Sequence, residues 1–550
     1  MDGSTTGGAG GTAGTAGSAP DRATNSLSGL MAAQFLCAFV DKAWNLVIAL
    51  CMLRASGVID DRGELTASDE VQQRAYAIAF AVFLVPLMIA SIPSAILADR
   101  FSKRSIMVNS MGLLTGLVAL GTAILYVNPT GGWPLYVLLV LLGLQAALFQ
   151  PARYSILPEL VSHERLSDAN GQLEMWNFFG IVSGTAVAGF ITFEAWPYTW
   201  IAAAFLTVVS LAGWFAARRI PRVPAASTRN YSPRVLLEAL KSIKSDPMLM
   251  LAVIGSAAFW AIATLIGQTL QVDAKNRLMF PDRLATVPIA FLGIGVGLGS
   301  AFAGKQSARK VETGLLPLGA FLLAGFTFAL ALIEPGRVGT FTLMLLMGAS
   351  AGLLLVPLDA IMQWRAPEDR RGAIIAIANA LMAGGIALGA ALAWAGTVGV
   401  ERHGGIIFGT SAAANGRALF IFSALFTLGA AVGAAFVVPQ AFVRLVLFLL
   451  THSIYRLKVV GRSNVPEKGG ARLVPNHVSF ADGLFLIASL DRPIRFLVDA
   501  SFFARPILGR VLRWLRAIPI SSEGGPRSIL RALRDAGKHL DEGNLVCIFA

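Results

Sequence analysis

The chain has few charged residues for its length. Asp, Glu, Lys and Arg together make up 14% of 550 residues, against 55% hydrophobic residues. A water-soluble fold of this size needs more polar surface than this to stay dissolved. The mean hydropathy of +0.66 indicates the same. The composition therefore excludes an ordinary soluble globular protein and predicts a protein embedded in a membrane.

Cysteine is also scarce, since only Cys37, Cys51 and Cys547 are present. Their spacing does not match a metal site. Cys37 and Cys51 are expected on one helix, about 21 Å apart at a rise of 1.5 Å per residue, so they cannot form a disulfide with each other. These residues leave the redox compartment open.

The first 26 residues lack the pattern of a signal peptide. They are rich in Gly, Thr, Ser and Ala, with no basic start that leads into an apolar core. We expect residues 1–26 to form a disordered tail.

A recognition fold for nucleic acid is lacking too, although the net charge is +13. The basic residues instead cluster in alternate loops between apolar segments, which is the cytoplasmic bias of membrane proteins. We therefore expect no nucleic-acid partner.

The apolar residues come in twelve blocks of about 20, long enough to cross a hydrocarbon core of about 30 Å. The expected segments are 27–53, 74–98, 105–127, 133–150, 169–193, 198–217, 248–271, 285–304, 315–334, 340–362, 372–399 and 417–438. An even number of crossings places both ends of the chain on one side of the membrane.

The loops on one side carry most of the basic residues. These are Arg100, Lys103 and Arg104, a group from Arg218 to Lys244, then Lys305, Arg309, Lys310, Arg365, Arg370 and Arg371. The opposite loops at 128–132 and 194–197 contain no Lys or Arg, and the loop at 54–73 is mainly acidic. The positive-inside rule then predicts that both termini are cytoplasmic.

A weak internal repeat divides the segments into two sets of six. Pro158-Glu159 precedes Asn170 as Pro367-Glu368 precedes Asn379, with eleven residues from each Glu to its Asn. We expect an N-terminal half at 27–217, a linker at 218–247 and a C-terminal half at 248–438. Two similar halves suit alternating access around a site near the midplane.

The pattern of long apolar segments ends after residue 438. The apolar stretch 442–450 is too short to span, so we interpret 439–460 as an interfacial helix and linker. Residues 461–550 then resemble a soluble α/β domain, with strands expected at 471–474 and 544–549 and a helix from about 482.

The loop after the second segment carries a gating motif. Residues 95–104 read Ala-Ile-Leu-Ala-Asp-Arg-Phe-Ser-Lys-Arg, which resembles the loop signature of the major facilitator superfamily, with alanine and serine in place of its two glycines. The resemblance implies that Asp99, Arg100, Lys103 and Arg104 lock helix ends in one state. Ordinary positive-inside loop charges are the alternative interpretation.

Further motifs resemble the bacterial lysophospholipid transporter branch of that superfamily. Residues 149–160 read Phe-Gln-Pro-Ala-Arg-Tyr-Ser-Ile-Leu-Pro-Glu-Leu and include Arg153 and Glu159. Residues 39–45 read Phe-Val-Asp-Lys-Ala-Trp-Asn, where the family usually has Phe-Asn-Asp. The valine departs from that pattern.

Ionisable residues inside apolar segments are costly and usually line a cavity. Asp41 and Asn45 lie one turn apart on one helix face, and Asp359 and Glu174 are further candidates. The functional alternatives for Asp41 are contact with a headgroup ammonium and transport of a coupling proton. The structural alternative is that these groups satisfy one another.

The last domain contains a motif for acyl transfer. Residues 476–483 read Asn-His-Val-Ser-Phe-Ala-Asp-Gly, which resembles the N-H-x-S-x-x-D block of glycerolipid acyltransferases. The resemblance implies His477 as general base, Asp482 as the carboxylate that holds its tautomer, and Asn476 and Ser479 as neighbours in the block. The E-G-T-R-like block of that family is expected directly after residue 550, so the domain is expected to be truncated.

The expected fold is thus an all-α bundle of 12 transmembrane helices in a 6+6 major facilitator arrangement, followed by a partial α/β acyltransferase domain. The resemblance implies a bacterial inner-membrane protein that flips a lysophospholipid, such as 2-acylglycerophosphoethanolamine, to the cytoplasmic leaflet and re-esterifies it. The acyl donor would be acyl-acyl carrier protein or acyl-coenzyme A, so acyl carrier protein is also an expected partner. No bound cofactor or metal is expected. The alternative is a drug or metabolite exporter with a non-catalytic tail.

Overall fold

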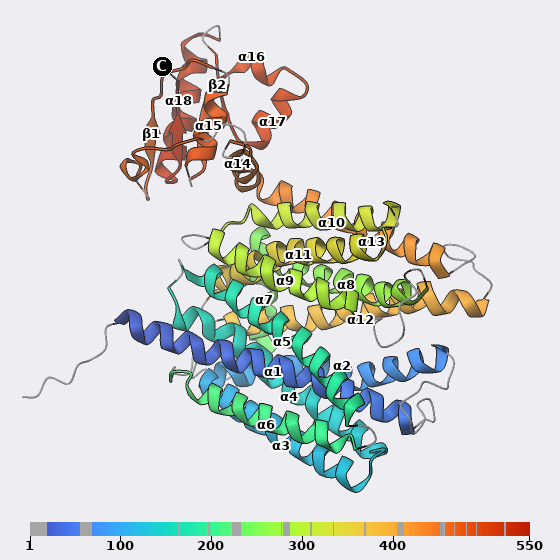
Figure 1. Ribbon diagram of the computed structural model, residues 1–550. Helices are drawn as coiled ribbons and strands as arrows, with labels where there is room; N and C mark the ends of the chain where they lie inside the picture. The colour runs from blue at the N-terminus through green and yellow to red at the C-terminus, as the bar shows by residue number, and fades with distance from the viewer. Residues whose placement is uncertain are drawn as a thin grey trace, which may run out of the picture.

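The apolar segments form long helices that run side by side (Figure 1). A bilayer offers no water to the backbone, and a helix satisfies its own N–H and C=O groups. The computed structural model describes residues 19–55, 69–162, 165–195, 198–222, 233–276, 278, 287–307, 311–333, 335–367, 370–403, 412–451, 453, 457–466, 468–479, 481–490, 492–521 and 524–549.

Six helices make up the first part of the bundle, named here the N-half. They are α1 (Ala19–Ala55), α2 (Asp69–Arg100), α3 (Lys103–Val127), α4 (Trp133–Leu160), α5 (Leu166–Glu194) and α6 (Trp200–Arg218). Six more make up the C-half. They are α8 (Pro247–Asn276), α9 (Val287–Gln306), α10 (Leu315–Ile333), α11 (Arg337–Arg365), α12 (Arg371–His403) and α13 (Ala412–Val437).

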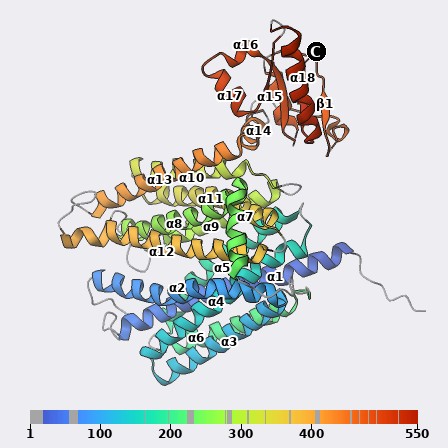
Figure 2. The ribbon, with the colours of Figure 1, turned by 180° about the vertical axis from the view of Figure 1, so that it is seen from behind.

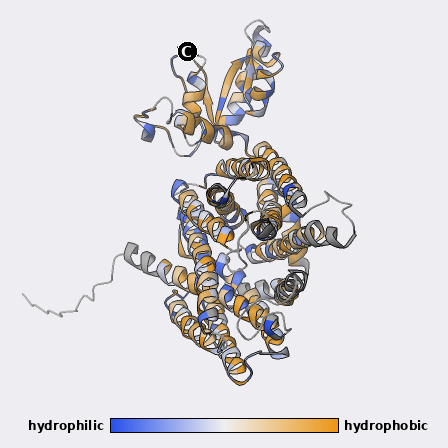
Figure 3. Cartoon of the chain, turned by 45° about the vertical axis from the view of Figure 1, so that its right-hand side comes forward, coloured by the Kyte–Doolittle hydropathy of each residue, from blue (hydrophilic) through white to orange (hydrophobic). Residues whose placement is uncertain are grey.

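Eleven helices of the described ranges are long and apolar enough to cross a membrane, and they match eleven of the twelve expected segments. The remaining expected segment corresponds to α2, whose described apolar stretch is Ala81–Ser94. Orange, hydrophobic ribbon dominates the bundle in Figure 3. The expected bundle of long apolar helices is therefore confirmed.

Some element boundaries differ from the expected ones. Helix α4 continues to Leu160 instead of ending at 150, although Pro151 and Pro158 lie inside it. Proline is tolerated there because neighbouring helices compensate for the lost backbone bonds. Helix α1 begins at Ala19, before the expected start at 27. The segment between the halves contains a helix that was not expected, α7 (Pro233–Ser245).

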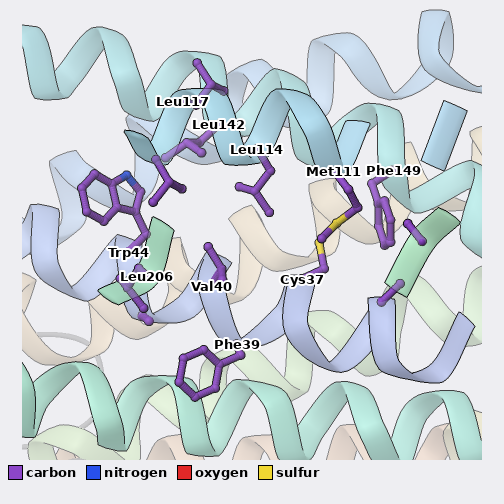
Figure 4. Packing of buried hydrophobic residues seen from close by; sticks show 14 of the residues in the cluster. Cys37, Phe39, Val40, Trp44, Met111, Leu114, Leu117, Leu142, Phe149 and Leu206 are labelled. Atoms are coloured by element: carbon purple, nitrogen blue, oxygen red, sulfur yellow. The ribbon is translucent and has the colours of Figure 1, made fainter. Parts of the chain in front are cut away.

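The core of the N-half is formed by buried side chains of α1, α3, α4, α5 and α6, and Figure 4 labels members from α1, α3, α4 and α6. Trp44 is fully buried, and its indole lies beside Gly121 of α3. A Cβ on Gly121 would lie 2.2 Å from that ring. The indole fits against α3 because Gly121 has no side chain.

The two halves meet most closely at one end of the bundle, named here the basic end, where α1 begins, α13 ends and the loops rich in Lys and Arg lie. Helix α5 packs along α9 and against α11, and α2 packs along α12. A Cβ on Gly171 of α5 would lie 2.5 Å from the Ser300 carbonyl oxygen and 2.8 Å from the Gly304 Cα. Small residues thus bring the two backbones together at this end.

The C-terminal region is a small parallel α/β layer. Its strands are β1 (Ala471–Leu473), β2 (Ile494–Asp499), β3 (Ile518–Ile520) and β4 (Leu545–Cys547), in the order β1-β4-β2-β3, with every neighbouring pair parallel. Its helices are α15 (Asp482–Ser489), α16 (Ala500–Phe503), α17 (Leu508–Trp514) and α18 (Gly525–Asp541), and a short 3₁₀ helix, η4 (Arg462–Asn464), precedes β1.

Helix α14 (Pro439–Leu450) joins this layer to the bundle, and the two views in Figures 1 and 2 both place the layer beside α10 and α13. On the bundle side, Phe442 stacks on Phe321 with ring centroids 5.6 Å apart, and Arg444 pairs with Glu312. On the other side, the Gln440 amide donates to the Leu515 carbonyl at 2.7 Å. The helix is thus held from both sides.

We expect Gly171→Ala to weaken the contact between the halves. The new Cβ would meet backbone atoms of α9, and overpacking of this kind costs about 1–3 kcal/mol. The check is the midpoint of thermal unfolding in detergent. Gly116→Ala on α3, with nothing within 4 Å of the new Cβ, is the control. Equal midpoints for the two variants would contradict the assignment of this contact.

Candidate active site and buried polar network

A network of polar side chains is buried inside the N-half. The Arg153 guanidinium on α4 is 2% exposed and donates to the Glu174 carboxylate on α5 at 3.1 Å. Tyr154 donates to the same oxygen at 3.0 Å, and the Asn177 amide donates to the other oxygen at 3.1 Å. Glu174 therefore accepts three hydrogen bonds, which offset part of the cost of burying a carboxylate.

The network continues to the interface between the halves. Asn170 on α5 and Gln363 on α11 exchange two hydrogen bonds, each 2.9 Å long, and both residues are buried. This amide pair joins the N-half to the C-half close to the basic end. The sequence reasoning missed it, although the repeated Asn170 and Asn379 were a signal for that region.

Asp359 lies on α11 near the amide pair and is 3% exposed. It borders a small pocket together with Tyr154, Gln363 and Asn379. Arg153 and Asp359 come from different halves, and each lies two residues after a proline within its helix.

The loop residues expected to gate the transporter make contacts within the N-half. Lys103 at the start of α3 is buried and pairs with Glu159 at the end of α4. Arg104 donates to the Arg218 carbonyl at the end of α6 at 2.9 Å, and Arg100 is exposed. The side chain of Asp99 lies outside the described residues. Lys103 and Arg104 thus fasten helices of the N-half together.

Asp41 and Asn45 lie one turn apart on α1, and both are half-buried. The Cys37 thiol donates to the Asp41 carboxylate at 3.7 Å. Asp41 thus lies on the same side of α1 as Cys37, which precedes it by one turn.

A tight turn after β1 forms the second candidate site. His477 follows β1, and Asp482 begins α15. The Asp482 Oδ2 atom accepts hydrogen bonds from the backbone N–H groups of Val478 at 2.7 Å and Ser479 at 2.8 Å, and lies 3.2 Å from His477 Nδ1. The carboxylate therefore closes the turn and orients the imidazole.

The electrostatics of this turn suit a general base. The backbone N–H groups of Ser479 and Val478, and then the imidazole of His477, lower the pKa of Asp482 below its usual value. An ionised Asp482 accepts a hydrogen bond from the Nδ1–H group, which leaves the lone pair of Nε2 free to accept a proton. His477 is exposed, so a substrate hydroxyl has access to it.

Phe549 is part of this site and was not foreseen. Its ring lies 4.5 Å from the imidazole of His477, and it stacks on Phe496 of β2 at 6.1 Å. Parallel strands end at the same edge of a sheet, where ligands bind in open α/β folds. Because β1 and β4 are neighbours, the residues that follow them meet there. Phe549 could have been assigned to the site only if the pairing of strands 471–473 and 545–547 had been known, and the sequence alone does not reveal that pairing.

The other residues of the motif lie at the same edge. Asn476 and Ser479 are exposed, and the Ser479 hydroxyl accepts from the backbone N–H of Ala481 at 3.2 Å. Arg505, just before α17, and Arg510, within α17, are exposed. Arg495 on β2 is buried instead and donates to the Leu515 carbonyl at 3.4 Å. Arg495 therefore serves the packing of the layer.

Two six-helix halves joined by a buried amide pair have the architecture of a membrane transporter, and the histidine–carboxylate turn lies at the edge of an appended α/β domain. The chain belongs to the Major Facilitator Superfamily, whose family model matches residues 30–390. The Acyltransferase family model matches residues 456–550. Both resemblances read from the sequence are thereby confirmed.

Curated relatives carry the name of one kind of transporter. The lysophospholipid transporter LplT of Serratia proteamaculans is 27% identical over 364 residues, which cover 65% of this chain and 84% of that protein. The lysophospholipid transporter LplT of Klebsiella pneumoniae is 27% identical over 370 residues, 66% of this chain and 86% of that protein.

Solved structures share the fold. A bacterial homologue of the iron transporter ferroportin in an outward-facing state has a TM-score of 0.57 at 14% identity, and it covers 74% of this chain and 98% of its own. The human organic anion transporter MFSD10 has a TM-score of 0.58 at 15% identity, and it covers 76% of this chain and 100% of its own. At these identities the likeness concerns the fold alone.

We expect Glu174→Gln to destabilise the bundle, because it leaves the buried guanidinium of Arg153 without its counter-charge. Breaking a buried pair costs about 3–5 kcal/mol. The same substitution in the exposed pair Arg370–Glu238, with nitrogen and oxygen 3.5 Å apart, should cost under about 1 kcal/mol. Thermal unfolding in detergent at fixed salt compares Glu174→Gln with Glu238→Gln. A smaller loss for Glu174→Gln than for Glu238→Gln would show that the network does not hold the helices.

Proposed function

We propose that the bundle flips lysophospholipid to the cytoplasmic leaflet and that the attached domain re-esterifies it. The observation that carries the proposal is the fusion itself: a transporter related to the lysophospholipid transporters LplT is followed by a domain of the Acyltransferase family. The substrate we propose is a 2-acylglycerophosphoethanolamine, and the site is the bacterial inner membrane with both termini in the cytoplasm.

The orientation follows from charge. The loops at the basic end carry Lys and Arg, while the opposite loops have few, and such loops stay cytoplasmic. The enzyme domain follows α13 at the basic end through α14. A lysophospholipid that is released at that end therefore reaches the enzyme without crossing the bilayer again.

Transport would proceed by rocking of the two halves. The contact of α5 with α9, together with the amide pair Asn170–Gln363, closes the basic end. Lys103, Arg104 and Glu159 fasten helix ends within the N-half, so that this half moves as one body. Asp41, Asn45 and Arg153 supply polar groups within the bundle, which are expected to contact the lipid headgroup.

The acyl transfer follows from the turn at His477. The Nε2 atom takes the proton from a glycerol hydroxyl as its oxygen attacks the thioester carbonyl of acyl-acyl carrier protein or acyl-coenzyme A. The carbon–sulfur bond breaks, and the imidazolium returns the proton to the leaving thiolate. Asp482 stabilises the imidazolium during the step, and the face of Phe549 adds a weaker attraction.

Lipid contact of the enzyme domain is supported by its surface. Ile507 is 77% exposed, and Leu508 and Val511 are also exposed on α17, next to Arg505 and Arg510. Apolar side chains flanked by Arg suit the interface of an anionic membrane. Together with α14, they would keep the active site beside the leaflet that holds the substrate.

Flipping of labelled lysophosphatidylethanolamine in proteoliposomes tests the transporter. The full-length protein should move the label across the bilayer, whereas liposomes without protein should not. If the protein leaves the lipid in place and transports an unrelated solute, the chain is an exporter with a non-catalytic tail.

The enzyme is tested with His477→Ala in the full-length protein. Loss of a general base lowers the rate by about 10²–10⁴-fold, so acyl transfer from acyl-acyl carrier protein should fall by that factor while lipid flipping stays unchanged. His539→Ala is the matched control, because His539 also lies 3.0 Å from a carboxylate, that of Glu542, but on α18. Full acyl transfer by His477→Ala would remove His477 as the base.

A further inference from the structure

One helix of the acyltransferase domain carries a continuous basic face. Arg527, Arg531, Arg534 and Lys538 of α18 follow one another at spacings of four, three and four residues, which place their side chains on one face of the helix. All four are exposed, and in the described part of the chain none of their side chains forms an ion pair or a hydrogen bond. They form a row of about 16 Å at a rise of 1.5 Å per residue, named here the basic stripe.

Two exposed leucines lie beside the basic stripe. Leu530 is 60% exposed and Leu533 is 51% exposed. The opposite face of α18 packs on the sheet through Ala532 and Ala536, which are buried. The two leucines therefore do not contribute to the core of the domain. Exposed apolar side chains next to charged ones are typical of a surface that binds another protein.

The basic stripe faces away from the bundle. Neighbouring residues of a strand point to opposite faces of a sheet, and Leu545 and Cys547 of β4 pack with Leu486 of α15, whereas Val546 packs with Ala532 of α18. Helix α14, which leads to the bundle, packs against α15, and Figures 1 and 2 show α15 between α14 and α18. The stripe thus lies opposite to the membrane connection of the domain, a position that does not suit contact with lipid.

One end of the basic stripe lies at the edge of the sheet that carries His477. The four strands are parallel, so their carboxyl ends share that edge. Strand β3 ends there at Ile520, and α18 begins five residues later, at Gly525. Arg527 is therefore the member of the stripe closest to the edge. The first acidic residue of α18 is Asp535, so positive charge is concentrated in the half of the helix next to this edge.

The shape of the basic stripe favours a protein over a small anion as its ligand. Sites for small molecules are concave, whereas the stripe is the outward face of a helix. A row of four cations with leucines beside it matches a helix that presents carboxylates at a similar spacing. The proposed reaction also needs a donor that brings an acyl thioester to His477 from the cytoplasm. An acidic carrier protein meets both requirements.

We propose that the basic stripe binds an acidic, helical protein that carries the acyl thioester, and so docks the donor beside the edge that holds His477. Carboxylates of the carrier pair with the arginines of the stripe, and Leu530 contacts its apolar surface. Charge pairing of this kind raises the rate of encounter and the affinity for the donor, and it leaves the proton transfer at Nε2 unchanged. The role in acyl transfer rests on the proposed function, whereas the binding itself does not.

Donor kinetics of Arg531→Glu/Arg534→Glu in the full-length protein test the proposal. With acyl-acyl carrier protein as the probe, KM should rise by about 10-fold or more at low salt, because two attractive charges become repulsive, while kcat stays unchanged. With acyl-coenzyme A, both constants should keep their wild-type values, which also shows that the domain is folded. Added salt should raise the KM of the wild-type protein for the carrier, and the variant should lose most of that dependence.

The matched control is Lys458→Glu/Lys468→Glu, which changes the net charge equally at two exposed lysines outside α18. It should keep the wild-type KM for both donors. An equal rise of KM for both donors in Arg531→Glu/Arg534→Glu would assign the stripe to the phosphates of coenzyme A or to the stability of the domain. A rise that needs vesicles of anionic lipid would assign it to the bilayer. Either result, or an unchanged KM, overturns the proposal.

Direct binding separates this proposal from the proposed acyl transfer. Purified acyl carrier protein, titrated into the full-length protein in detergent, should bind the wild-type protein and the lysine control alike, and Arg531→Glu/Arg534→Glu about 10-fold more weakly. If the wild-type protein transfers no acyl group from either donor, the enzyme function fails, while the titration still decides the role of the stripe. No binding by the wild-type protein, or equal affinity of all three proteins, would show that the stripe is not the docking surface.

Discussion

The contact between the two halves at the basic end is the constraint on which the rest of the bundle depends. Backbones of α5 and α9 approach so closely at Gly171 and Gly304 that a side chain has no space, and one pair of amides crosses the same boundary. Close packing of this kind is bistable, because interfaces tolerate discrete arrangements better than continuous deformation. An alternating-access protein needs such a boundary.

Charge is distributed around that contact in two different ways. Lys103 and Glu159 at the helix ends, and Arg153 and Glu174 inside, form pairs within the N-half, and such pairs leave little net charge to solvate. Asp359 on the C-half side has no such partner among the described residues. The asymmetry matters because removal of a carboxylate from water costs free energy that ion pairs and hydrogen bonds must offset.

The acyltransferase domain differs, because its histidine–carboxylate turn is exposed to solvent. The Asp482 carboxylate gathers two backbone N–H groups and an imidazole within one turn. The motif 476–483 predicted this turn, because His477, Asp482 and the N–H donors all lie within a few residues of one another. Phe549 was beyond prediction, because its place beside His477 depends on the pairing of β1 with β4, which are far apart in the chain.

The sequence by itself determined the membrane bundle, the basic end and the histidine–carboxylate turn, because hydropathy, loop charge and short motifs act over neighbouring residues. Only the tertiary structure decided that Gln363 pairs with Asn170, that α4 carries Pro151 and Pro158 within the helix, and that Asp359 borders a pocket lined by both halves. These features arise where helices distant in sequence meet, and helix–helix packing follows from side-chain shape on both surfaces at once. No single stretch of the chain contains that information.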